Sequence, residues 1–425
     1  MKRIVIPVLA LAPTILGCMH GCGATASQGA FAPVVPTTQA NTVMLDPSES
    51  QAVGESINGL AAPLFARLAS ASPGNFVFSP SSIHGAFAMT AIGARGATES
   101  ELQTALAIPS GASDRLRHEG ALQQRWNAPV EGRRMRVVNR LFGEATTHFE
   151  APYLETLRAS FASPLEPVDF RGDAEGVRVH INAWVDESTE HRIQDLLPPN
   201  ATTADTRLVL VNAVYLDARW AQPFEQSSTF PQVFTLASGE VMQAPTMHAR
   251  VMVSFGELDG AQIVEMPYEG GDLAMRFILP PVGSDASWMS VSHLGALPLE
   301  RTQVDIALPK FEMTPTESLS LVSHMQALGV HLAFDAEQAD FTSIATFPDP
   351  SHRLYISNAF HRAFIRVDEL GTEAAAATAV VMAEGAGMPT PAPSVMFNRP
   401  FFFQLIDVPS GATLFLGRVT NPLNH

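Results

Sequence analysis

The chain has 425 residues, of which 46% are hydrophobic and 16% charged, a balance that is typical of a large globular core and excludes a mainly disordered protein. Its formal net charge of −16 at pH 7 argues against nucleic acid or another polyanion as a partner. Both cysteines, Cys18 and Cys22, lie near the start of the chain, so no disulfide, thiol nucleophile or cysteine-bound metal is expected in the rest of it.

Residues 1–22 have the layout of a bacterial export signal rather than of a membrane span. Lys2 and Arg3 precede an apolar stretch over residues 4–16. The segment Ile15-Leu16-Gly17-Cys18 resembles a lipobox, which implies that Cys18 is lipidated and becomes the mature N-terminus. A plain signal peptide cleaved nearby is the alternative, and Cys22 fits the lipobox less well. We expect an exported protein, either a lipoprotein of the outer membrane or cell surface or an extracellular protein.

Residues 23–50 are rich in Ala, Thr, Gln, Ser and Pro, and they predict a flexible tether before a folded domain over residues 51–425. Within the domain, apolar residues at helical spacing predict a helix over residues 82–92, which ends at Gly93. The sequence Thr98-Glu99-Ser100-Glu101 has the pattern of a capping box and predicts a second helix that ends before Pro109.

Further along the chain, apolar residues spaced as on one helix face predict a third helix around residues 177–188. Residues 208–216 are almost wholly apolar and rich in β-formers, which predicts a strand buried on both faces. Residues 401–406 and 413–419 predict two strands joined by a turn at residues 409–411. Helices dominate early and strands dominate late, so the expected fold class is α+β.

Common catalytic motifs are missing from the sequence. It has no Gly-x-Ser-x-Gly, no His-Glu-x-x-His, no phosphate-binding loop and no dinucleotide glycine fingerprint. The 13 histidines are dispersed without the spacing of metal ligands. We therefore expect neither an enzyme nor a metal or other cofactor.

Residues 369–397 support two local interpretations. Glu369-Leu370-Gly371-Thr372-Glu373 precedes four alanines and Thr378, and a tail rich in Gly and Pro follows. The small residues and the Gly/Pro tail are typical of an exposed flexible loop. The alanines also suit a short helix with Thr372 as its N-cap.

The wider sequence resembles the serpin family from about residue 50 to residue 422. Nine or more blocks occur in the family's order, among them Asn75–Ile83, Gly93–Thr98, Val138–Phe142, Ile181–Val185, Leu210–Tyr215, Leu308–Phe311, Ala339–Phe341, Asn398–Phe401 and Phe415–Pro422. The resemblance implies three β-sheets surrounded by eight or nine helices, with an exposed reactive loop at one pole.

The same resemblance assigns roles to particular residues. Gly371 to Thr378 matches the family's hinge pattern Gly-Thr-Glu-Ala-Ala-x-Ala-Thr. The implied hinge comprises Glu369, Gly371, Thr372, Glu373, Ala374, Ala375, Ala376, Ala377 and Thr378. The implied shutter beneath the main sheet comprises Ser79, Ser82, Asn212 and His361, and the breach, where the hinge enters, contains Trp220 and Lys310. Ordinary core packing is the alternative for these residues. Lys310 is the one lysine besides Lys2, and the resemblance pairs it with Glu369.

By resemblance, the protein is a suicide-substrate inhibitor of serine endopeptidases. A protease cleaves the loop and stays bound as a covalent acyl complex, while the severed hinge inserts into the main sheet. Thr372, Ala374, Ala376 and Thr378 would form the buried face of the new strand, and all four are small and uncharged. Inhibition of papain-like cysteine proteases, and a non-inhibitory carrier or chaperone, are the alternatives. The family also implies a monomer that can polymerise on heating.

The reactive bond is expected at Gly385-Ala386, because the family usually cleaves after the seventeenth residue counted from the hinge glutamate, here Glu369. Met382, Glu384 and Ala386 are further candidates for the residue before the cut. Small or apolar residues there favour an elastase-like or subtilisin-like target, whereas Glu384 favours a glutamate-specific one. No Arg or Lys lies between Gly371 and Asn398, which argues against trypsin-like targets.

Overall fold

The computed structural model describes residues 45–163, 165–284, 293–295, 297–347, 349, 352–372 and 392–424. Its α-helices are α1 (Pro47–Ala71), α2 (Pro80–Ala91), α3 (Gly96–Ala105), α4 (Asp114–Asn127), α5 (Ala151–Phe161), α6 (Phe170–Ser188) and α7 (Val322–Ala327). These are seven helices in the described part, where eight or nine were expected. Two short 3-10 helices span Gln226–Ser228 and Leu332–Phe334. Among the described residues, no helix is both long and apolar enough to cross a membrane.

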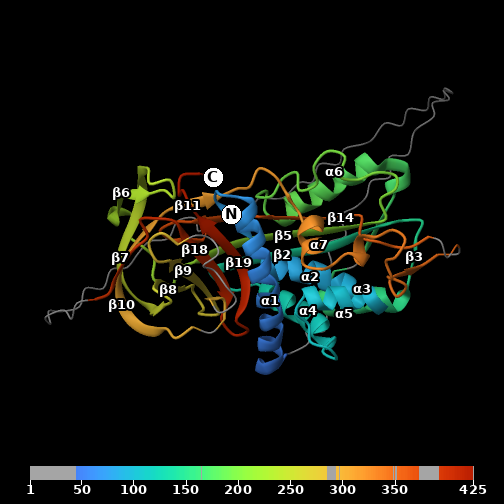
Figure 1. The fold of residues 1–425 in the computed structure, drawn as a ribbon, viewed down its shortest axis with the longest axis horizontal. Helices are drawn as coiled ribbons and strands as arrows, with labels where there is room; N and C mark the ends of the chain where they lie inside the picture. Colours follow the sequence, from blue (N-terminus) through green and yellow to red (C-terminus); the bar gives the residue numbers. More distant parts are fainter. Residues whose placement is uncertain are drawn as a thin grey trace, which may run out of the picture. The chain divides into compact units, whose positions relative to one another are not determined.

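In the described part of the chain, three β-sheets complete an α+β fold, as the sequence predicted. The main sheet contains β11 (Phe311–Met313), β15 (Ile365–Val367), β16 (Gly371–Thr372), β5 (Leu208–Arg219), β14 (Asn358–Ala363), β12 (Leu319–Ser320), β2 (Arg133–Glu144) and β4 (Glu166–Val168). In Figure 1, helices α2 to α6 lie around β2, β5 and β14, on one side of α1.

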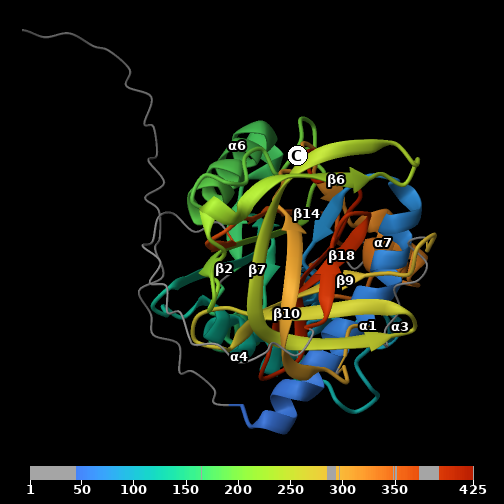
Figure 2. The same ribbon diagram turned by 90° about the vertical axis from the view of Figure 1, so that its left-hand side faces the viewer.

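The second sheet contains β1 (Phe76–Phe78), β19 (Ala412–Val419), β18 (Phe401–Asp407), β9 (Leu273–Leu279), β8 (Ala261–Pro267), β7 (Val241–Leu258), β10 (Glu300–Pro309), β17 (Ser394–Met396) and β6 (Thr229–Thr235). Figure 2 shows its long antiparallel strands β7 and β10 side by side. The predicted hairpin is β18 and β19, paired antiparallel. The small third sheet joins β13 (Ala345–Thr346) to β3 (His148–Phe149).

Two helix starts differ from the predictions. Helix α1 begins at Pro47, inside the predicted tether, because Asp46 and Glu49 form a reciprocal capping box at its first turn. Helix α3 begins at Gly96, so the capping box predicted at Thr98 was wrong. The Thr98 hydroxyl instead accepts the amide of Asp340 (3.0 Å), and the Glu101 carboxylate accepts the amides of His331 and Leu332 (each 2.8 Å).

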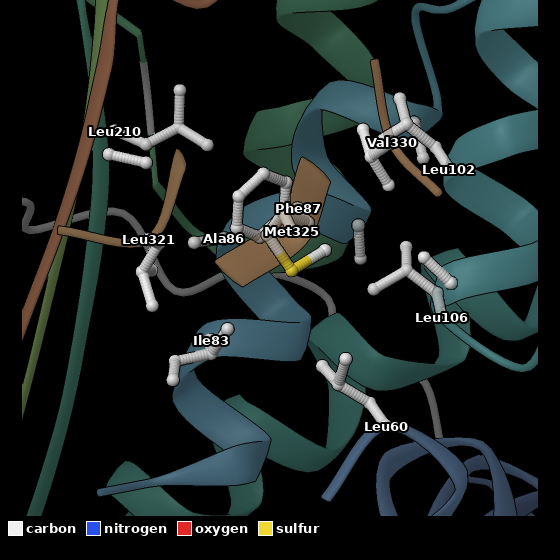
Figure 3. Close-up of a cluster of buried hydrophobic side chains, with 14 of the residues drawn as sticks. Leu60, Ile83, Ala86, Phe87, Leu102, Leu106, Leu210, Leu321, Met325 and Val330 are labelled. Atoms are coloured by element: carbon white, nitrogen blue, oxygen red, sulfur yellow. The ribbon is translucent and has the colours of Figure 1, made fainter. Parts of the chain in front are cut away.

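Helix α2 lies at the centre of the fold and packs against β5 and β2. Every one of its residues is buried. Ile83 and Phe87 meet Leu210 of β5, Met325 of α7 and apolar residues of α1 and α3 (Figure 3). Each fully buried side chain of this size contributes about 1.5–3 kcal/mol to folding. This packing fixes the residues at the start of α2 beneath the main sheet.

Candidate functional site

Strand β5 changes its partner along its length. Its first half pairs in parallel with β14, from Val209 opposite Asn358 to Val214 opposite Ala363. We call this parallel pairing the β5–β14 seam. Beyond the seam, β5 pairs antiparallel with β16, which places Thr372 opposite Ala218. On its other edge β16 pairs with β15. The short strand β16 therefore occupies the sheet directly above the seam.

The start of the predicted hinge is thus part of the main sheet. Gly371 passes so close to β5 that a Cβ atom there would lie 2.0 Å from the carbonyl oxygen of Ala218, which explains the glycine. Thr372 lies in β16, with a side chain that is only 1% exposed. The other predicted hinge residues, Glu373 to Thr378, and the predicted reactive bond Gly385-Ala386 lie outside the described residues.

The four predicted shutter residues meet behind the seam. The Ser79 amide donates to Nε2 of His361 (3.0 Å), and Nδ1 of His361 is hydrogen-bonded to Oδ1 of Asn212. The side-chain amide of Asn212 donates in turn to the Ser82 hydroxyl (2.5 Å). The Ser79 hydroxyl accepts the amide of Ser82 (3.2 Å) and so caps α2, and its backbone is what contacts His361.

The protonation state of His361 follows from these contacts. Nε2 accepts a backbone N–H, so the ring is neutral and its proton lies on Nδ1. The side chain is 1% exposed, and burial lowers the pKa of His361 to about 3. Protonation of this ring would place an unpaired charge inside the fold.

Two residues that the sequence did not single out belong to the same network. Asn139 of β2 lies opposite Asn212 in the sheet, and its Oδ1 accepts hydrogen bonds from Asn212 and from the Ser82 hydroxyl (3.2 Å). Its amide donates to Gln123 of α4 (3.2 Å). Asn139 lies inside the block Val138–Phe142, but only the strand register reveals its partner. The polar network therefore crosses three adjacent strands, from β2 through β5 to β14.

The predicted breach holds the segment that leads into β16. The Trp220 side chain is 1% exposed, and its indole N–H donates to the carbonyl of Asp368 (3.0 Å). The backbone N–H of Trp220 donates to the carbonyl of Leu370 (2.9 Å). Its ring stacks on Tyr268, with centroids 4.4 Å apart and planes 18° apart.

Glu369, also in this segment, is paired with Lys310. The Nζ atom of Lys310 lies 2.8 Å from Oε2 of Glu369, and the Thr229 hydroxyl donates to Oε1 (2.8 Å). Glu369 is 5% exposed. Burial alone would raise the pKa of Glu369, but the hydrogen bonds from Lys310 and Thr229 outweigh it and hold the pKa below its usual value. The carboxylate is therefore ionised near neutral pH.

Residues 55–422 match the family model described as serpin (serine protease inhibitor). The chain belongs to the serpin family. Among curated proteins, the chain is similar to leukocyte elastase inhibitor A of Mus musculus, with 33% identity over 381 residues, 85% of this chain and 97% of that protein. The family is described as one of serine protease inhibitors, which are not catalysts.

Solved serpin structures agree in fold. Serpin48 of the insect Tenebrio molitor, described as a highly specific serpin, superposes with a TM-score of 0.75 at 27% identity and covers 88% of this chain and 99% of its own. Human thyroxine-binding globulin complexed with thyroxine superposes with a TM-score of 0.77 at 26% identity and covers 88% of this chain and 100% of its own. The latter structure holds a bound small molecule, so the fold by itself does not decide between inhibitor and carrier.

In this serpin, the reactive loop would connect two different sheets. The last described residue before the loop, Thr372, lies in the main sheet. The first strand after it, β17 from Ser394, lies in the second sheet, where it pairs in parallel with β10 at the edge. The loop thus starts directly above the seam. No group of three or more His, Cys, Asp and Glu that could bind a metal occurs in the part of the chain that the structure describes.

Proposed function

We propose that this serpin inhibits elastase-like or subtilisin-like serine endopeptidases as a suicide substrate. The protease serine attacks the carbonyl carbon of Gly385, the peptide bond to Ala386 breaks, and the new amine leaves with a proton. The protease then remains joined to Gly385 by an ester while the severed hinge enters the main sheet. The small side chains at the expected bond, and the similarity to a leukocyte elastase inhibitor, support this target class.

The start of the hinge carries the proposal. Thr372 already pairs antiparallel with β5. Extended along β5, this register sets Thr378 opposite Asn212 in the inserted strand. Because β14 runs parallel to β5, the new strand would be antiparallel to both neighbours. Each new backbone hydrogen bond would stabilise the product by about 0.5–1.5 kcal/mol net.

Insertion requires the β5–β14 seam to separate. The hydrogen bond between Asn212 and His361 spans this seam, so it must break as the strands part. Both residues are buried and need new partners in the product. The polar network therefore suits a gate that opens only when a strand is ready to fill the gap.

The location of the protein is part of the proposal. We propose that residues 1–22 direct export, that Cys18 carries a lipid, and that residues 23 onward tether the domain to a membrane surface. Apart from this membrane anchor, we expect the domain to act as a monomer, and its protein partner is the target protease.

One experiment tests the function directly. The purified domain is incubated with pancreatic elastase, subtilisin and papain, and the products are analysed by denaturing electrophoresis and mass spectrometry. An adduct with elastase or subtilisin that resists denaturation, joined through Gly385, is expected. An adduct with papain alone would move the target to cysteine proteases. Cleavage by all three enzymes without any adduct would favour a carrier function.

A further inference from the structure

We infer that Tyr268 is a positioning residue that sets the register in which the hinge enters the sheet, an inference that rests on the proposed insertion mechanism. The hydroxyl oxygens of Tyr268 and Thr372 lie 2.6 Å apart. Both side chains are 1% exposed, so water does not compete for this hydrogen bond. Tyr268 directly follows β8 of the second sheet, and Thr372 is the last described hinge residue.

Tyr268 is held in place without help from the hinge. Its ring stacks on Trp220, and its backbone N–H donates to the carbonyl of Leu273 (3.0 Å). The next amide, that of Glu269, donates to the carbonyl of Arg219 (2.9 Å). Burial raises the pKa of Tyr268 far above its usual value, so the phenol keeps its proton. The hydroxyl is thus a fixed point beside the end of β5.

The stacked pair of Trp220 and Tyr268 holds alternate residues of the entering chain. Trp220 binds the carbonyl groups of Asp368 and Leu370, and Tyr268 binds the side chain of Thr372. Thr372 is already opposite Ala218, so the hydrogen bond to Tyr268 does not need to break during insertion. It favours one register before and after cleavage.

A fixed register matters because strand side chains alternate between two faces. A slip by one residue would turn Glu373 toward the buried face on which Thr372 lies. An unpaired carboxylate there would cost several kcal/mol and stop the strand. By holding Thr372, Tyr268 keeps the small side chains of the hinge on the buried face from the start of insertion.

The test compares Tyr268→Phe, which keeps the stacked ring, with Thr372→Val and Thr372→Ser. The hydrogen bond favours the correct register over a slipped one, so we expect loss of either hydroxyl to raise the population of slipped chains about fivefold, the effect of one ordinary hydrogen bond, and to slow productive insertion accordingly. More inhibitor molecules are then cleaved for each protease trapped, while the first binding step is unchanged. Thr372→Ser should behave like the parent protein. The double variant should be no worse than either single variant, because both remove the same bond.

Tyr153→Phe is the matched control. Tyr153 is also a buried tyrosine, and its hydroxyl donates to the carbonyl of Met89 (2.9 Å), away from the hinge. We expect this variant to lower the melting temperature without changing the ratio of trapping to cleavage. Equal ratios in Tyr268→Phe and the parent, or additive effects in the double variant, would overturn the inference.

A second readout separates this inference from the inhibitor proposal. The loop is cut with a protease that is not trapped, and the rate at which the cut protein gains thermal stability reports insertion alone. Slower gain in Tyr268→Phe supports the register role even if the parent traps no protease, in which case only the inhibitor proposal fails. Equal rates in the parent and Tyr268→Phe would reject the register role.

Discussion

His361 on β14 and Asn212 on β5 are direct partners in the register of the main sheet, and their side chains are hydrogen-bonded across the seam between these strands. No other strand separates β5 from β14 at this point. The proposed inhibitor must open the sheet here, so the chemistry of this pair should control when the sheet opens.

Acid should weaken the fold through His361. Its pKa is lowered from the usual 6.5 to about 3 in the folded protein, so between these pH values the unfolded chain binds a proton that the folded chain does not bind. The free energy of unfolding should fall by about 1.4 kcal/mol per pH unit, or about 2 kcal/mol between pH 6.5 and 5. His324, also lowered by burial, adds in the same direction. His84 has a raised pKa, because its pair with Glu119 outweighs burial, so the folded chain binds this proton more readily than the unfolded chain and His84 contributes no loss on acidification.

Urea unfolding at several pH values measures this effect. His361→Gln should flatten the profile between pH 6.5 and 5, whereas His352→Gln, at an exposed position, should leave it unchanged. An equally steep profile in His361→Gln would assign the acid sensitivity to other groups.

Removing the Lys310 side chain should release the hinge. Lys310→Ala leaves the carboxylate of Glu369, which is 5% exposed, without its cation. We expect a loss of about 1–3 kcal/mol, less than for a fully buried pair because the Lys310 side chain is 39% exposed. Mild heating should then produce latent or polymerised protein, seen by size-exclusion chromatography.

Two variants make this test sharper. Charge reversal at both positions, Lys310→Glu with Glu369→Lys, should partly restore the monomer. Arg250→Ala is the control, since its pair with Asp305 joins β7 and β10 on an exposed face and should contribute at most about 1 kcal/mol. If Lys310→Ala elutes like Arg250→Ala after heating, the pair does not hold the hinge.

A charge on the inward face of the hinge should turn the inhibitor into a substrate. Ala376→Arg would have to insert opposite Val214, which is fully buried, so insertion should stall and the trapped fraction should fall at least tenfold. Glu373→Arg is the control, because that position alternates to the other face, opposite the partly exposed Asp217. The cleaved bond should be the same in both variants. Full trapping by Ala376→Arg would reject the insertion face proposed for the hinge.

Replacing Cys18 with Ser should release the protein from the membrane fraction while it is still exported, because the lipid supplies the anchor. Palmitate labelling of the expressed full chain checks this expectation, with Cys22→Ser as the control that keeps its label. Labelling that persists in Cys18→Ser but disappears in Cys22→Ser would assign the lipid to Cys22.

Local pattern was sufficient for much of the architecture. The apolar run at residues 208–216 became the buried strand β5, and the two segments around residues 409–411 became the hairpin of β18 and β19. These elements follow from short-range periodicity and turn residues, so the sequence predicts them. The family's blocks also identified the serpin fold and pointed to Ser82, Asn212 and His361.

Contacts between distant segments decided the rest. Thr98 and Glu101 looked like a local cap, but amides more than 200 residues away, at Asp340 and His331, bind them instead. Asn212, which bonds to Asn139, and Thr372, which bonds to Tyr268, likewise lie on other strands, and no spacing in the sequence marks these pairs. A buried polar group must bond to whichever partner the fold brings within about 3 Å, and strand register and packing set that partner. Those two properties arise only in the folded chain.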